Sequence, residues 1–167
     1  MNKFLTEVND LCRTVDHNIV RVNSGGCAVF AAFMGQCLEK YGTVTIAVGN
    51  DESDTRSLDV LRTNIDVNVL EEWSDNDVYL THVIIEFTYK GVKYHIDSTG
   101  VHKPRLTTYS GDFWILDGRL SVSEITSLAS DTSWNHQFDR KQIPKIKKMI
   151  NTGFKNLFNR GFMPTVG

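Results

Sequence analysis

A stripe of apolar residues recurs at helical spacing near the start of the chain and predicts a surface helix over residues 2–15. The stripe consists of Phe4, Leu5, Val8, Leu11, Cys12 and Val15. The next segment, CAVFAAFMGQCLEKYG (27–42), is apolar on most of its circumference. We therefore expect a helix that packs on more than one side and is ended by Gly42. The β-branched run TVTIAV (43–48) predicts a short buried strand.

The clearest strand pattern is THVIIEFTYKGVKYHIDSTG (81–100), in which two alternating runs flank Lys90-Gly91. This pattern predicts a β-hairpin with a two-residue turn. Such a turn pairs Tyr89 with Val92, and the same register places Asp97 opposite Ile84. The segment STGVHKPR (98–105) is then interpreted as the loop that leaves the hairpin.

This register divides the hairpin into a polar and an apolar face, because side chains alternate along a strand. His82 and Asp97 become diagonal neighbours at the open end of the polar face. Glu86 and His95 oppose each other on the same face, where we expect a solvated surface pair. The apolar face, expected to cover the core, carries Val83, Ile85, Phe87, Val92, Tyr94 and Ile96.

Two helices are predicted in the second half of the chain. Ser121 is followed three residues later by Glu124, which is a capping-box pattern for a short helix. Residues 140–160 predict a basic C-terminal helix weakened by Gly153. Its apolar face is expected to contain Ile146, Met149, Ile150, Phe154, Leu157 and Phe158.

Length and composition favour one globular domain over residues 1–167, with 41% hydrophobic and 23% charged residues. We expect its core within residues 20–100 and an acidic insertion at residues 50–79. No apolar run approaches the roughly 18 residues of a membrane helix, and the N-terminal segment is amphipathic, unlike a secretory signal. A cytoplasmic protein is therefore expected.

The chain has three cysteines at irregular spacing and no CxxC pair. An odd number argues against a disulfide framework, and the missing pair argues against a structural zinc site. No cofactor is expected.

Charge is distributed unevenly, although the net charge is only −2. From Arg140 onward there are seven lysines or arginines and no acid, so residues 1–139 hold 11 bases and 20 acids, a net charge of −9. The helix at 140–160 could contact nucleic acid or an anionic membrane. Its apolar face equally suits docking onto the rest of the chain, which is the preferred interpretation.

The stretch NSGGCAVF (23–30) places Cys27 at the first turn of the predicted apolar helix. Unpaired N–H groups and the positive end of the helix dipole favour thiolate over thiol at this position. Cys27 is therefore a candidate nucleophile, although a cysteine beside Ala, Val and Phe is also typical of a small core residue.

His82 and Asp97 supply what a nucleophilic thiol requires. An imidazole accepts the thiol proton, and a carboxylate orients the imidazole and stabilises its charged form. Cys27, His82 and Asp97 are thus candidates for a catalytic triad. The same three residue types also match a three-ligand metal site, which is a third interpretation. His17, His102 and His136 have no evident partner in the sequence.

A cysteine at a helix N-terminus, a histidine that starts one strand and an aspartate that ends the next resemble the papain-like cysteine peptidase superfamily, in particular its transglutaminase-like branch. The motifs GGCAVFA (25–31) and HVIIEFTYKGVKYHIDSTG (82–100) also resemble those of small phage and bacterial proteins of that type. The resemblance implies an α+β fold in which N-terminal helices, with the cysteine on a central helix, pack against an antiparallel sheet. A phage-encoded member would act in the host cytoplasm.

The chain departs from this pattern at two positions. Val83 stands where an aromatic residue often follows the histidine, and Arg21 stands where papain-type enzymes have a glutamine. The backbone N–H of Cys27, with the side-chain amide of Asn23 or Asn18, is the candidate oxyanion hole. Gly26 and Thr99 are expected at the rim of the site.

These residues predict an acyl-transfer enzyme. Cys27 would attack an amide or ester carbonyl of a protein or peptide substrate, with His82 moving the proton. Water as acceptor defines a peptidase, amidase or deamidase, and an amine defines a transglutaminase, the less favoured outcome. The alternative is a papain-like scaffold without activity that acts as a binding or inhibitory protein.

Overall fold

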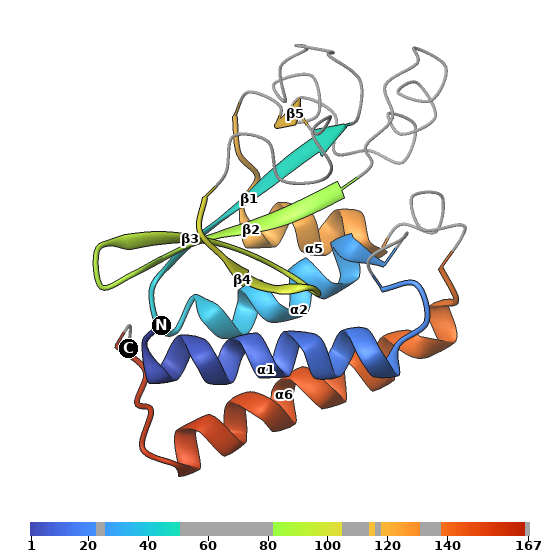
Figure 1. Ribbon diagram of the computed structural model, residues 1–167. Helices are drawn as coiled ribbons and strands as arrows, with labels where there is room; N and C mark the ends of the chain where they lie inside the picture. Colours follow the sequence, from blue (N-terminus) through green and yellow to red (C-terminus); the bar gives the residue numbers. More distant parts are fainter. Residues whose placement is uncertain (23–25, 51–81, 105–113, 116–117, 131–137, 166–167) are drawn as a thin grey trace.

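The computed structural model describes residues 1–22, 26–50, 82–104, 114–115, 118–130 and 138–165. These form an α+β fold around an antiparallel sheet (Figure 1). The strands are β1 (Thr43–Asn50), β2 (His82–Tyr89), β3 (Val92–Asp97), β4 (Gly100–His102) and β5 (Trp114–Ile115), in the order β4-β3-β2-β1-β5. The predicted acidic insertion at 50–79 lies almost entirely outside the described residues.

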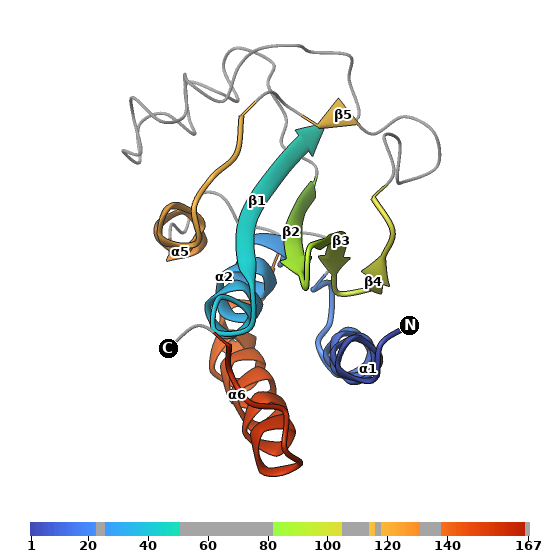
Figure 2. The ribbon, with the colours of Figure 1, turned by 90° about the vertical axis from the view of Figure 1, so that its left-hand side faces the viewer.

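Three helices lie along one face of the sheet: α1 (Lys3–Asn18), α2 (Cys27–Leu38) and α5 (Val122–Ser130). In Figure 2, α2 lies between the other two, beneath strands β1 and β2. The fourth described helix, α6 (Ile143–Asn159), packs against α1 and α2 on the side away from the sheet. The helix that carries Cys27 is therefore covered on several sides, as its apolar circumference predicted.

Helix α1 forms where the apolar stripe predicted it and continues three residues further. The side chain of Asn2 caps its start by accepting the N–H of Phe4 at 2.9 Å. Helix α2 begins at Cys27 but ends at Leu38, before the expected end. Gly42 is needed for close packing instead, because a Cβ there would lie 2.3 Å from the carbonyl oxygen of Thr88.

The hairpin has the predicted turn and register. Lys90 and Gly91 have φ angles of 50° and 80°, as a tight two-residue turn requires, and Tyr89 pairs with Val92. Strand β2 also pairs with β1, the predicted strand, which extends to residue 50. The segment after Asp97 was wrongly interpreted as a loop. It turns back at once as β4, in which Gly100 pairs with Asp97.

The second half of the chain contains both predicted helices. Ser121 and Glu124 form the capping box at α5, each side chain accepting the other residue's backbone N–H at 3.0 Å. A 3₁₀ turn at Arg140–Gln142 leads into α6, which buries Ile146, Ile150, Phe154 and Leu157.

One prediction for α6 was wrong, while the weakening of this helix by Gly153 stays a prediction. Phe158 is 47% exposed and does not belong to the buried face. Gly153 serves the packing of α6 on α1, because a Cβ there would lie 2.5 Å from the Leu11 side chain. The docking of this helix is thus built on apolar contacts. Contact of its exposed lysines with nucleic acid or a membrane stays a prediction.

The core lies between the sheet and the helices. Val83, Ile85, Phe87 and Ile96 of the hairpin meet Phe4 and Cys12 of α1 and Phe30 and Met34 of α2 there. Val92, which was expected on this apolar face, is 52% exposed near the turn. Of the helices in the described ranges, none combines the length and the apolar character that crossing a membrane would require.

Candidate functional site

The candidate nucleophile lies at the first residue of α2. Its N-cap, Gly26, provides no side-chain hydrogen bond, so the N–H groups of the first turn are not capped from that residue. A Cβ on Gly26 would lie 2.8 Å from the ring of Phe138, so only glycine fits beside this ring. Phe138 and the rest of the core hold the backbone on which Cys27, itself half-buried, begins the helix.

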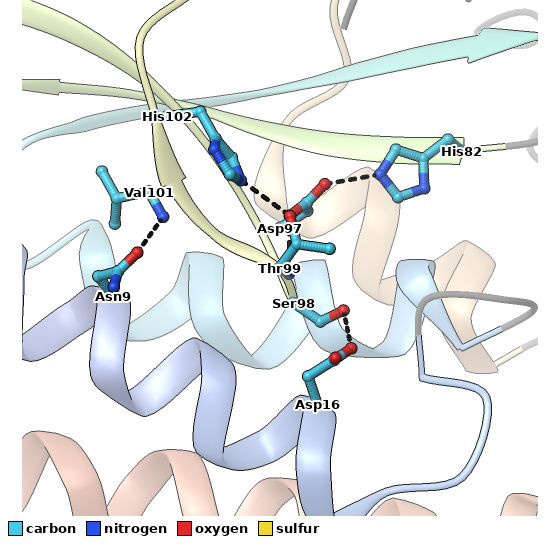
Figure 3. A network of polar contacts seen from close by, with 8 residues as sticks. All are labelled: Asn9, Asp16, His82, Asp97, Ser98, Thr99, Val101 and His102. Carbon is cyan, nitrogen blue, oxygen red and sulfur yellow. Dashed lines mark hydrogen bonds and ion pairs between the residues drawn. The ribbon is translucent and has the colours of Figure 1, made fainter. Parts of the chain in front are cut away.

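His82 and Asp97 are joined as the hairpin register predicted. The imidazole Nε2 lies 3.0 Å from Asp97 Oδ2 (Figure 3). His82 is 7% exposed and Asp97 2% exposed, so this pair is buried. The two residues belong to the polar face of the sheet, at the end of β2 where β1 carries Gly49 opposite the histidine.

The environment of His82 favours the charged imidazole. Burial of the ring lowers the pKa of His82, but hydrogen bonds to Asp97 and to the Cys27 side chain raise it, and together these effects give a pKa of about 9. The His82 imidazole therefore interacts with both of the other predicted triad residues, the Asp97 carboxylate and the Cys27 side chain.

Asp97 has further partners that the sequence did not reveal. Its Oδ1 accepts the Thr99 N–H at 2.8 Å and the Thr99 hydroxyl at 2.5 Å. His102 Nε2 lies 3.6 Å from the same oxygen. Burial raises the pKa of Asp97, but its interactions with His102, His82 and Thr99 outweigh burial and hold that pKa well below its ordinary range. Thr99, predicted at the rim, is exposed and also contacts the triad aspartate directly.

The structure describes two of the three candidate donors of the oxyanion hole. Asn23 lies outside the described residues. Asn18 donates one of its two amide N–H groups to the Thr14 carbonyl within α1, at 2.7 Å. The backbone N–H of Cys27, on the first residue of α2, stays a candidate donor.

The other two cysteines differ from Cys27 in position. All three are free of disulfides, as predicted. Cys12 is buried on α1, where burial raises its thiol pKa well above the ordinary value. Cys37 lies one residue before the end of α2 with its sulfur 3.6 Å from Asn151 Oδ1, and burial raises its pKa as well.

Glu86 and His95 oppose each other as predicted, but the expected solvated contact was wrong. Glu86 is 6% exposed and His95 5% exposed, and their side chains are 3.3 Å apart. Arg119 donates its Nε–H to Glu86, and Lys93 Nζ lies 3.6 Å from it. In this Glu86 cluster, defined by these four residues, Glu86 and His95 are buried, whereas the side chains of Arg119 and Lys93 are 34% and 55% exposed.

We expect Glu86→Gln to lower the free energy of unfolding by about 3 kcal/mol near neutral pH. The hydrogen bond from His95, together with Arg119, lowers the pKa of Glu86 from 4.5 to about 2 although burial raises it. The contribution of a depressed carboxyl is present above its unfolded pKa and is lost as pH falls through the folded value. The difference between parent and variant should therefore narrow toward pH 2.

Urea unfolding of both proteins, measured between about pH 7 and about pH 3, checks this prediction. Glu39→Gln, at an exposed position of α2's C-cap, is the matched control and should change little. An equal loss at every pH would show that the carboxylate charge of Glu86 does not provide the stability.

Within the described part of the chain, no group of three or more His, Cys, Asp or Glu side chains is arranged to hold a metal ion. Compared with protein-family models, with curated proteins and with solved structures, the chain gives no match.

Proposed function

We propose that this protein is a cysteine-dependent acyl-transfer enzyme that uses Cys27 as nucleophile, His82 as general acid and base, and Asp97 to orient the imidazole. The observation that carries the proposal is the buried imidazole of His82, held at 3.0 Å by Asp97 and hydrogen-bonded to the thiol-bearing residue at the start of α2. A buried histidine with a pKa of about 9 needs a negative partner, and the Asp97 carboxylate supplies one. In the proposed enzyme the thiolate of Cys27 is the second.

The proposed reaction starts with the proton on the imidazole and the negative charge on sulfur. The sulfur forms a bond to the acyl carbon of an amide or ester, and the carbonyl π electrons move to oxygen. When this intermediate collapses, the bond to the leaving group breaks and His82 gives its proton to the departing amine or alcohol. The product that stays on Cys27 is a thioester.

The second half returns the enzyme to its starting state. His82 removes a proton from water, the oxygen forms a bond to the acyl carbon, and the carbon–sulfur bond breaks to release the acid. Hydrolysis is the favoured outcome because water needs no second binding site. An amine in place of water would give a transglutaminase.

Several features support a papain-like, transglutaminase-like fold for this chain. The cysteine starts a helix packed on an antiparallel sheet, the histidine starts β2, and the aspartate ends β3. Proteins of the superfamily that the sequence resembles share this order, so we propose the same class of substrate, a protein or peptide.

The pH dependence of iodoacetamide alkylation, read by mass spectrometry at each cysteine, tests the proposed function. Near pH 6 a free cysteine reacts slowly because little thiolate is present. We expect Cys27 to react there at least about tenfold faster than either other cysteine, and to lose most of that rate in His82→Ala.

His17→Ala is the matched control, because His17 is exposed and its imidazole lies 3.3 Å from the Arg13 carbonyl in its own helix. It should leave the profile unchanged. A Cys27 that reacts no faster than Cys37, or that keeps its rate in His82→Ala, would contradict the proposal and favour a binding or inhibitory protein on a papain-like scaffold.

A further inference from the structure

The two carboxylate oxygens of Asp97 contact different groups. Oδ2 faces the imidazole of His82 at 3.0 Å. Oδ1 is turned the other way, toward Thr99, from which it accepts a backbone and a hydroxyl hydrogen bond at 2.8 and 2.5 Å. The orientation of one oxygen fixes that of the other, so the groups on Oδ1 decide where Oδ2 points.

The protons available on each group determine which one donates in the hydrogen bonds that link His102, Thr99 and Asp97. An ionised carboxylate only accepts, so the single hydroxyl proton of Thr99 goes to Asp97. Thr99 Oγ1 also lies 2.8 Å from His102 Nε2 and must therefore accept, which places a proton on His102 Nε2. The bonds run from His102 to the hydroxyl and from the hydroxyl to the carboxylate.

Helix α1 holds the turn that carries these groups (Figure 3). Ser98 Oγ donates to Asp16 Oδ1 at 2.8 Å, and Asn9 Oδ1 accepts the Val101 N–H at 3.0 Å. Gly100 has a φ of +135°, and a Cβ there would lie 2.3 Å from Asn9 Oδ1. Two side chains of one helix therefore fix the backbone on either side of Thr99.

We propose that Thr99 and His102 are positioning residues that hold the Asp97 carboxylate in the orientation required by the catalytic imidazole. This inference rests on the proposed function for the role of the imidazole. It extends the triad by a hydroxyl on the β3–β4 turn and by a second histidine at the end of β4. Thr99 is exposed and the His102 side chain is 42% exposed, so either can be changed without opening the core.

The ionisable groups around this carboxylate come from four elements. They are Cys12 and Asp16 of α1, Cys27 of α2 through the imidazole, His82 of β2 and His102 of β4. Cys12 is uncharged near neutral pH because burial raises its pKa, and Asp16 contacts the turn through Ser98. Of these groups, His82 and His102 are the ones that contact the carboxylate directly.

The test measures two quantities in Thr99→Val, Thr99→Ser and His102→Ala. One is the pH titration of the His82 ring by NMR, and the other is the alkylation rate of Cys27 near pH 6. We expect Thr99→Val to shift the His82 midpoint down by about one pH unit and to slow alkylation about tenfold. His102→Ala should act in the same direction, and Thr99→Ser should restore both values because it keeps the hydroxyl.

Thr14→Val is the matched control, since the Thr14 hydroxyl is exposed on α1 and donates to the Asp10 carbonyl in the same helix. A His82 titration that Thr99→Val leaves unchanged, or that Thr99→Ser fails to restore, would overturn the positioning role. The NMR titration decides this point even if Cys27 in the parent proves unreactive, an outcome that would refute the proposed function alone.

Discussion

Cys27→Ala is expected to reduce the turnover of an activated ester such as p-nitrophenyl acetate by at least about 1,000-fold, to the level of the uncatalysed reaction. The sulfur is the atom that forms the acyl bond, so the variant cannot form the acyl-enzyme at all. Mass spectrometry of the parent, quenched early, should show the acetyl group on Cys27.

Cys37→Ala is the matched control for this experiment. Cys37 belongs to the same helix and is also half-buried, but its sulfur lies near Asn151 and burial raises its thiol pKa. Its removal should leave turnover unchanged. Hydroxylamine added as a competing acceptor then separates hydrolysis from transfer to an amine. Turnover that persists in Cys27→Ala, or an acetyl group found on Cys37, would refute the nucleophile assignment.

The parts of the site that the sequence predicts correctly depend on short-range rules. The Lys90-Gly91 turn determines the hairpin register, because both residues take positive φ angles and residues on either side must then pair in order. Register together with side-chain alternation places His82 beside Asp97. The start of α2 at Cys27 follows in the same way from a glycine pair before an apolar helical run.

The parts that the sequence does not predict depend on contacts between distant segments. Strand β4 is three residues long, and it forms because α1 holds its backbone through Asn9, 92 residues from Val101. No local pattern indicates this contact, so Thr99 and His102 were not recognised as partners of Asp97. The sequence Ser98-Thr99-Gly100 after Asp97 is typical of a turn. The contact with α1 determines that β4 follows this turn at once.

The burial of Glu86 and His95 also depends on a contact between distant segments. Glu86 and His95 form a cross-strand pair that alternation places on the polar face, where solvent is the usual expectation. Arg119, 33 residues beyond Glu86, contributes the charge that makes a buried carboxylate stable there. Gly42 and Gly153 illustrate the same limit, because each is required by a chain segment that packs against it and not by its own local conformation.

Asp97→Asn is expected to slow Cys27 alkylation near pH 6 by about 100-fold while the hairpin stays folded. The amide has nearly the shape of the carboxylate but carries no charge, so burial, which lowers the pKa of His82, is no longer opposed by an anion on Nε2. The imidazole then loses its proton near neutral pH and no longer stabilises a thiolate. Asp10→Asn, at an exposed position of α1, is the control and should react as the parent does.

The same substitution has a pH-dependent effect on stability whose sign follows from His82. The pKa of His82 is raised from 6.5 to about 9 in the folded protein, so the pair with Asp97 contributes its full stability below the unfolded value and loses it as pH rises through about 9. Asp97→Asn should therefore cost more free energy of unfolding near pH 6 than near pH 10. Urea titrations of parent and variant at both values measure the difference. An equal cost at the two pH values would mean that His82 is uncharged in the folded protein, which would contradict the imidazolium on which the proposed reaction begins.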